Sequence, residues 1–336
     1  VLRAQQPSTL RQYQSAWAKF MSFLITKECL ITNVTLNIVC EFIKHQQDVF
    51  NRDYRTLAAY KSSLRLPLLY AANLETNCTM MDQFMRGIFN TNPPKKAKEM
   101  PLWSLNGLLT FLDTARFEPL ETVHYRFLVQ KTLCLILLSS GRRIGEITNL
   151  SDSSSFNRAD SRLHLKWLTE FKPKHDTPSF RPPCPSISRL EDPTGVQLTL
   201  CPIRAYHIFK NRSTNWHRDV ENIQDLQPLW VKPNASLPSS IPELSKAFIS
   251  LVQDYRKSNK LPINIPIGPH QTRKYSGAYS VQLNQKKENI VKVMGFSSFT
   301  ILKKNYVAEV PPLTVPCALP GGSHFPMPQH TISDSD

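Results

Sequence analysis

The sequence has 336 residues, which is enough to bury a sizeable core and better suited to two domains than to one. Lys and Arg together number 41 against 26 Asp and Glu, giving a formal net charge of +15 and a pI near 9.6. Such an excess destabilises a compact protein through self-repulsion unless a polyanion is its usual partner. The composition therefore makes nucleic acid the first expected partner and an anionic membrane surface the second.

Composition also argues against other classes of protein. No apolar run approaches the roughly 20 residues needed to span a bilayer, and the longest lies only around Leu133 to Leu138. The 7 cysteines are scattered and form no C-x-x-C pair, which argues against a disulfide framework or a zinc site and favours a reducing compartment. Because the chain begins at Val1, we expect it to be part of a longer polypeptide.

Residues 1–92 predict a small helical domain with basic exposed faces. Apolar residues recur at helical spacing, and one such stretch, RTLAAYKSSLRLPLLYA, places Lys61 and Arg65 beside an apolar stripe. Short helices of this kind form a bundle that could lie along a phosphate backbone. Lys61 and Arg65 are therefore candidates for DNA binding. The alternative is that they are simply solvated, which is as common for a charged helix face.

Residues 93–101 predict a basic, proline-rich linker. The stretch lacks apolar periodicity and combines prolines with Lys95, Lys96 and Lys98. Cationic side chains in a linker can contact phosphates, so these three lysines are further candidates for DNA binding.

Residues 102–308 predict a second domain that is mainly helical with a small β-sheet. The segment YRFLVQKTLCLILLSS is apolar nearly all round and is expected to be a buried helix. RLHLKWL, at 162–168, alternates as a strand does, and helical spacing returns beyond Cys201. The last stretch, 309–336, carries several prolines and is expected to be a disordered tail.

The segment SSGRRIGEITNL contains the first candidate site residues. Gly141 is placed to end the buried helix, and Arg143 and Glu146 lie about one turn apart at the start of the next helix. Arg143 can then point into a cleft while Glu146 braces it. Alone, the R-x-x-E pattern more often marks an ion pair on the protein surface.

Two later segments add three more candidates. In GPHQTRKYS, His270 and Arg273 share one face if the segment is helical. In MGFSSFTILKKNYV, Tyr306 ends a basic stretch that is compatible with a helix. Each pattern is unspecific alone, because a tyrosine normally serves packing and an H-x-x-R pair has no single function.

In this order and spacing, the three segments resemble the tyrosine recombinases. Their pattern is G-x-R-x-x-E, then H-x-x-R, then a Gly-His/Trp-x-Ser segment that leads to the nucleophilic tyrosine. The likeness covers residues 8–308, and PLWSL, LCPIRAYHIF and the span from Gly295 to Tyr306 are most similar to enzymes of eukaryotic DIRS-type and Ngaro-type retrotransposons. The resemblance implies a helical, SAM-like core-binding domain in 1–92 and an α+β catalytic domain in 102–308.

The resemblance also implies a role for each candidate. Attack on a phosphodiester builds negative charge on the non-bridging oxygens, and Arg143 and Arg273 would supply bidentate, permanently charged donors to them. Tyr306 would form a 3′-phosphotyrosyl bond and release a 5′ hydroxyl, so that the bond energy is kept for religation. His270 would assist proton movement and hold the phosphate. This chemistry requires neither a metal nor a small-molecule cofactor.

Two further positions follow from the family pattern. In the family, a lysine on a β-hairpin turn protonates the leaving 5′ oxygen, and Lys174 is the first candidate here, with Lys172 close behind. Where the family has His or Trp after the glycine, this chain has Phe296. Phenylalanine can preserve the packing but cannot donate a hydrogen bond, so the loss of transition-state stabilisation is expected to be about 1–3 kcal/mol.

The leading hypothesis is a site-specific DNA recombinase or integrase that cuts and rejoins strands during mobile-element integration. The alternative is a catalytically impaired or repurposed DNA-binding protein derived from such an enzyme, and a basic helical scaffold without a nucleic-acid role is a third class. The resemblance implies double-stranded DNA as the partner, self-assembly as a tetramer on it, no membrane partner, and a nuclear location.

Overall fold

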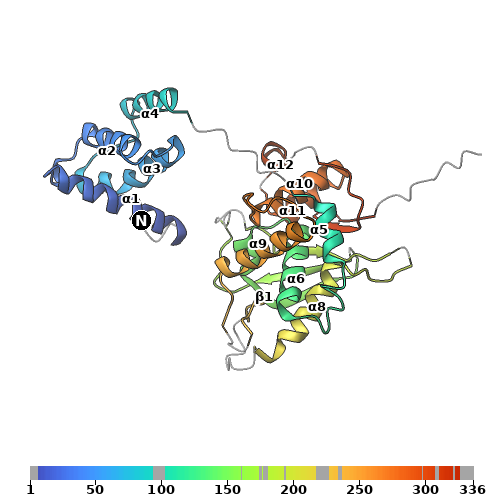
Figure 1. Cartoon of the computed structure of the whole chain (residues 1–336). Coiled ribbons are helices and arrows are strands. Elements are labelled where there is room, and N and C mark those ends of the chain that lie inside the picture. Colours follow the sequence, from blue (N-terminus) through green and yellow to red (C-terminus); the bar gives the residue numbers. More distant parts are fainter. Residues whose placement is uncertain are drawn as a thin grey trace, which may run out of the picture. The chain divides into compact units, whose positions relative to one another are not determined.

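In a computed structural model the chain divides into two compact units, Val1–Met100 and Pro101–Asp336 (Figure 1). The structure describes residues 7–93, 103–159, 161–173, 176, 181–192, 194–216, 227–233, 237–296, 298–306, 310–320 and 322–325. None of the helices in these ranges is both long and apolar enough to cross a membrane.

The first unit is a bundle of helices. Its elements are α1 (Pro7–Thr26), the 3-10 helix η2 (Ile31–Asn33), α2 (Leu36–Asp48), α3 (Tyr54–Ala72) and α4 (Thr79–Thr91). The core is aromatic where α1 meets α2, since the rings of Phe20 and Phe42 meet edge to face with centroids 5.1 Å apart. Asp53 fixes the start of α3 by accepting a hydrogen bond from the backbone N–H of Thr56. The helical periodicity of this part of the sequence therefore predicted its helices correctly.

The second unit is mainly helical with two small antiparallel sheets. Its helices are α5 (Leu105–Leu112), α6 (Tyr125–Ser140), α7 (Ile144–Thr148), α8 (Pro202–Ser213), η3 (Thr214–Trp216), α9 (Ile241–Ser258), α10 (His270–Gln282), α11 (Lys287–Met294) and α12 (Phe299–Tyr306). Its strands are β1 (Leu150–Asn157), β2 (Arg162–Trp167), β3 (Ser186–Ser188), β4 (Cys317–Leu319) and β5 (Gly322–His324). One sheet has the order β1-β2-β3, and β4 pairs with β5 in the other.

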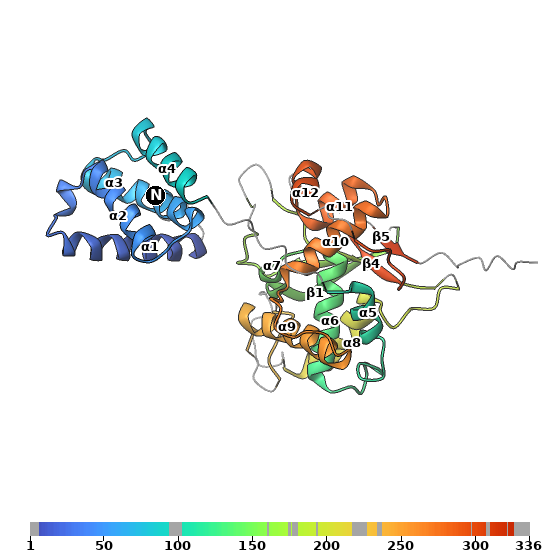
Figure 2. The same ribbon diagram turned by 45° about the horizontal axis from the view of Figure 1, so that its top comes forward.

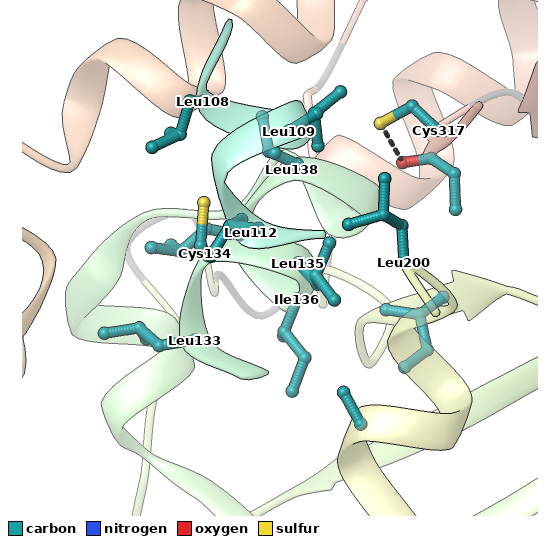
Figure 3. Packing of buried hydrophobic residues seen from close by; sticks show 14 of the residues in the cluster. Leu108, Leu109, Leu112, Leu133, Cys134, Leu135, Ile136, Leu138, Leu200 and Cys317 are labelled. Carbon is teal, nitrogen blue, oxygen red and sulfur yellow. Dashed lines mark hydrogen bonds between the residues drawn. The ribbon is translucent and has the colours of Figure 1, made fainter. Parts of the chain in front are cut away.

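Helix α6 is the centre of the second unit. It packs against α8, α9, α10 and β4, and Figure 2 shows these elements around it. Figure 3 shows its apolar side chains among those of α5 and of the segments before α8 and in β4; the labelled residues are Leu108, Leu109, Leu112, Leu133, Cys134, Leu135, Ile136, Leu138, Leu200 and Cys317. A helix that is apolar on every face has to be surrounded, so the expected buried helix is confirmed.

The expectation of a disordered tail over 309–336 is wrong for its first part. Leu313 and Leu319 are buried in the core of the second unit, and β4 and β5 form a hairpin. Asn106 holds this segment as well, since its side chain donates to the Pro312 carbonyl at 2.8 Å and accepts from the Thr314 N–H at 2.9 Å. The prolines mark an extended, well-packed connection here, and residues 326–336 lie outside the described ranges.

A buried ion cluster ties α6 to α8. The Lys131 side chain is fully buried, and its Nζ donates to the Leu112 carbonyl at 2.8 Å and to Glu118 Oε1 at 2.5 Å. Arg204 donates two hydrogen bonds of 2.9 Å to the same carboxylate. Desolvation alone would raise the pKa of Glu118, but the hydrogen bonds from Arg204 and Lys131 outweigh it and lower that pKa.

Replacing Glu118 with alanine should destabilise the protein by about 3–5 kcal/mol, because Lys131 would keep its burial and lose its counter-ion. Glu121→Ala is the matched control: Glu121 contacts Arg204 at 3.5 Å from a side chain that is 56% exposed, so its loss should cost little. Urea unfolding measures both variants. Similar costs for the two would contradict the assignment.

The cost should also depend on pH. A lowered carboxylate pKa stabilises the fold above the ordinary value of 4.5, and this contribution is lost as the pH falls through the lower folded-state pKa. The difference in unfolding free energy between the wild-type protein and Glu118→Ala should therefore narrow in acid.

Candidate functional site

The first candidate residues lie where α6 ends. Gly141 adopts the left-handed conformation, with φ of 59°, and stops the helix. Arg143 then precedes α7: its backbone N–H donates to Glu146 Oε2 at 3.1 Å and its Nη1 donates to Oε1 at 3.2 Å. Glu146 is buried, whereas the Arg143 side chain is 26% exposed. Glu146 thus braces Arg143, as the spacing predicted, and the Arg143 side chain stays partly exposed.

Helix α10 carries the second pair. It begins at His270, which is exposed, and Arg273 lies one turn later with its side chain buried. Desolvation, followed by the positive charges of Arg273, Lys274 and Arg143, lowers the pKa of His270. His270 and Arg273 therefore lie one turn apart on the same helix, and the charge of Arg143 also acts on the imidazole.

Arg273 connects three segments of the unit. Its Nη1 donates to the carbonyl of Gly141 at 2.5 Å and to that of Met294 at 2.9 Å. Its Cζ lies 4.1 Å from the centroid of the Phe296 ring, a cation–π contact. The side chain is therefore held between the end of α6 and the end of α11, and a phosphate that binds Arg273 directly has to displace part of this cover.

Phe296 stands where a hydrogen-bond donor was expected from the resemblance. It follows Gly295, which ends α11 with φ of 67°, and it is 5% exposed. Its backbone N–H donates to the Val291 carbonyl at 3.0 Å, and its ring packs in a small apolar cluster with Ile290 and Leu302. The ring keeps the packing and covers Arg273, but it offers no N–H to a phosphate.

Tyr306 is the last residue of α12, which packs against α10 and α11 (Figure 2). Leu302 anchors this helix in the apolar cluster around Phe296. The Tyr306 side chain lies outside the described part of the structure, so the structure gives the position of this residue in the helix and no contact of its hydroxyl.

The lysine candidates lie on the connection between β2 and β3. These strands are antiparallel neighbours, so the intervening segment returns to the sheet as a hairpin does. Lys172 is exposed on it, and Lys174 falls outside the described residues. Among the described residues, no cluster of three or more His, Cys, Asp or Glu side chains could hold a metal ion.

The DNA-binding candidates of the first unit are paired with carboxylates. Lys61 Nζ lies 2.5 Å from Asp82 Oδ1, and Arg65 Nε lies 3.6 Å from Glu75 Oε1. Both cations line a cavity of about 750 Å³ together with Arg86, which our sequence analysis missed. Lys95, Lys96 and Lys98 are outside the described residues.

Neither a model of a known protein family nor a curated protein matches the sequence. Among solved structures, the Tn1549 transposon integrase in complex with transposon right end DNA aligns over 88% of this chain and 89% of that chain, with a TM-score of 0.57 and 18% identity. The XerH site-specific recombinase bound to palindromic difH substrate aligns over 89% and 76%, with a TM-score of 0.57 and 14% identity. A lambda integrase dimer bound to a COC′ core site aligns over 90% and 72%, with a TM-score of 0.50 and 13% identity.

These similarities establish the fold. The chain has the two-part fold of these recombinases and integrases, a helical domain followed by a mainly helical domain with a small sheet. The predicted fold class is confirmed. The likeness to retrotransposon enzymes in particular stays a prediction.

If Arg143 and His270 share one site, replacing Arg143 with glutamine should raise the pKa of His270 toward its ordinary value. The rise should be partial, because desolvation is the larger cause of the lowering. An NMR titration of the His270 ring measures it. Lys246→Gln, an exposed charge change on α9, is the control and should leave the titration unchanged. If the pKa of His270 is unchanged in Arg143→Gln, the two residues do not share one site.

Proposed function

We propose that this protein is a tyrosine recombinase that cuts and rejoins DNA strands through a 3′-phosphotyrosyl intermediate. The observation that carries the proposal is the position of Arg273 between the ends of α6 and α11, with Arg143 just after α6 and His270 one turn earlier on α10. Tyr306, on a helix packed against α10 and α11, is the proposed nucleophile. The fold supports this chemistry, and the net charge of +15 supports duplex DNA as the partner.

In the proposed reaction, the Tyr306 oxygen attacks phosphorus and the bond from phosphorus to the 5′ oxygen breaks. His270 has a lowered pKa, so it is neutral at neutral pH and can accept the tyrosine proton. Arg143 stabilises the charge that develops on the non-bridging oxygens. The leaving 5′ oxygen takes a proton from a lysine of the β2–β3 connection, for which Lys174 and Lys172 are the candidates. Reversal with another 5′ hydroxyl rejoins the strands.

A second candidate function is DNA binding without cleavage. The observation that favours it is the cover over Arg273, whose side chain is fully buried beneath a phenyl ring that cannot donate to phosphate. A chain of this kind would retain the fold and the basic surface of a recombinase while its chemical step is slow or lost.

We further propose that the cellular role is integration of a mobile element, with a tetramer assembled on two duplexes in the nucleus. The support for a mobile-element role is the resemblance of PLWSL, LCPIRAYHIF and the Gly295–Tyr306 span to retrotransposon enzymes. The tetramer follows from the need to hold four strands during exchange.

Covalent trapping tests the proposed nucleophile. A library of nicked duplexes with randomised sequence around the nick should yield a protein–DNA adduct that survives denaturation, and peptide mapping should place the DNA on Tyr306. A nick lets the short 5′-hydroxyl product diffuse away, so the intermediate accumulates. Tyr306→Phe should bind DNA with unchanged affinity and give no adduct.

Tyr125→Phe is the matched control for this experiment. The Tyr125 hydroxyl has no hydrogen-bond partner among the described residues, so its removal should leave both stability and the adduct unchanged. An adduct that persists in Tyr306→Phe would overturn the assignment of the nucleophile. Binding without an adduct across the whole library would favour the second candidate function.

Replacing Phe296 with tryptophan should speed cleavage. The indole keeps an aromatic face over Arg273 and adds an N–H beside the scissile phosphate. A transition-state bond of about 1.4 kcal/mol corresponds to a roughly tenfold faster step, with little change in DNA affinity. Single-turnover cleavage of a trapped site measures this, with Phe296→His as the smaller donor. Equal or slower cleavage by both variants would show that Phe296 is adapted to its place.

A further inference from the structure

Arg142, the neighbour of Arg143, is buried completely and has no role in the proposed chemistry. Its side chain is 0% exposed, and its Nε donates to the Val293 carbonyl at 2.6 Å. Its Nη2 donates to the Pro183 carbonyl at 2.7 Å and more weakly to that of Lys292 at 3.4 Å. One guanidinium thus joins the start of α7, the segment leading into β3, and the last turn of α11.

The acceptors on α11 are carbonyls of its last turn. The last turn of a helix leaves its C=O groups without intrahelical donors and carries the negative end of the helix dipole. Arg142 donates to the carbonyl of Val293 and shares that of Lys292 with the Gly295 N–H, which donates to it at 3.2 Å. Arg273 donates to the next carbonyl, that of Met294. Two buried cations therefore hold three consecutive carbonyls at the point where α11 turns toward α12.

Gly295 permits this close approach. A Cβ at Gly295 would lie 2.1 Å from Arg142 Nη1, and the residue also needs a φ of 67°. Both requirements restrict this position to glycine. The next residue is Phe296, and the helix that follows ends at Tyr306, so the position of the Arg142 guanidinium determines where this segment begins.

Burying a guanidinium is costly, and an apolar side chain of similar size would fill the space at lower cost. Desolvation lowers the pKa of Arg142 to about 10, which leaves it charged at neutral pH. Glu146 Oε2, 4.0 Å from Nη1, is the carboxylate beside it. A buried charge is best explained here by the geometry that its forked donors impose on the carbonyls around it.

We infer that Arg142 is a positioning residue for strand cleavage: it fixes the end of α11, and with it the start of the segment that carries Phe296 and Tyr306, relative to Arg143. This inference rests on the proposed function. Arg142 touches no reacting atom. It acts through the backbone of α11, so its loss should change where the nucleophile lies while the phosphate-binding side chains remain.

The experiment compares Arg142→Met and Arg142→Lys with Arg256→Met. Arg256, on α9 and outside the site, is the matched control. It too is a buried arginine, and its Nε donates to the backbone carbonyl of Pro262. Hydrogen exchange of the full chain should show at least tenfold faster exchange over 287–306 in Arg142→Met, with α6 unchanged. Arg256→Met should leave 287–306 unchanged.

Single-turnover cleavage of a site recovered from the trapping library provides the second measurement. Loss of a residue that only stabilises the fold would lower the amplitude of cleavage, because the amplitude counts folded enzyme. Loss of a positioning residue would lower the rate constant of cleavage instead. We expect Arg142→Met to cleave at least tenfold more slowly at full amplitude and with unchanged DNA affinity. Arg142→Lys should also be slow, because one ammonium cannot reproduce the forked geometry.

The outcomes separate this inference from the function on which it rests. If the wild-type protein forms an adduct and Arg142→Met cleaves at the wild-type rate, the inference is wrong and the recombinase assignment stands. If the wild-type protein forms no adduct, the proposed function fails, and the exchange measurement alone decides whether Arg142 fixes the end of α11. Unchanged exchange over 287–306 would overturn the inference in either case.

Discussion

The second unit depends on one turn of the chain, at the left-handed residue Gly141. A Cβ at this position would lie 2.7 Å from Met294 Cγ, so the site needs glycine for close packing as well as for its φ of 59°. Its carbonyl accepts the hydrogen bond from Arg273, and the next two residues are Arg142 and Arg143. The same turn therefore ends the buried helix α6 and leads directly into the arginines of the candidate site.

Local sequence determines how much of this fold could be predicted. The α6 segment was predictable because its apolar residues cover every face, and β2 was predictable because its residues alternate. The β4–β5 hairpin was not, since prolines dominate the composition around it. The buried residues of this segment, such as Leu313 and Leu319, are not spaced at a regular interval, because much of the segment is an extended connection. Strand β4, which contains Leu319, packs against α6 and β3, which lie far away in the sequence.

The site shows the same division. Glu146 was expected to brace Arg143 because their contact spans a single turn. No local pattern distinguishes the partly exposed Arg143 from the buried Arg142, because the carbonyls that hold Arg142 belong to α11 and to the segment before β3. The cation–π contact between Phe296 and Arg273 was hidden for the same reason. A family pattern identifies which residues to examine, whereas long-range packing decides which of them a phosphate can reach.

The docked C-terminal segment limits the reach of the proposed nucleophile. Val310 is buried in the core of the second unit, and Asn106 holds the chain just beyond it. Only residues 307–309 separate Tyr306 from Val310. A fully extended chain covers at most about 3.6 Å per residue, so the Tyr306 Cα stays within about 14 Å of the Val310 Cα while the hairpin is docked. While β4 stays in the core, Tyr306 is therefore tethered close to the second unit and cannot move far from it.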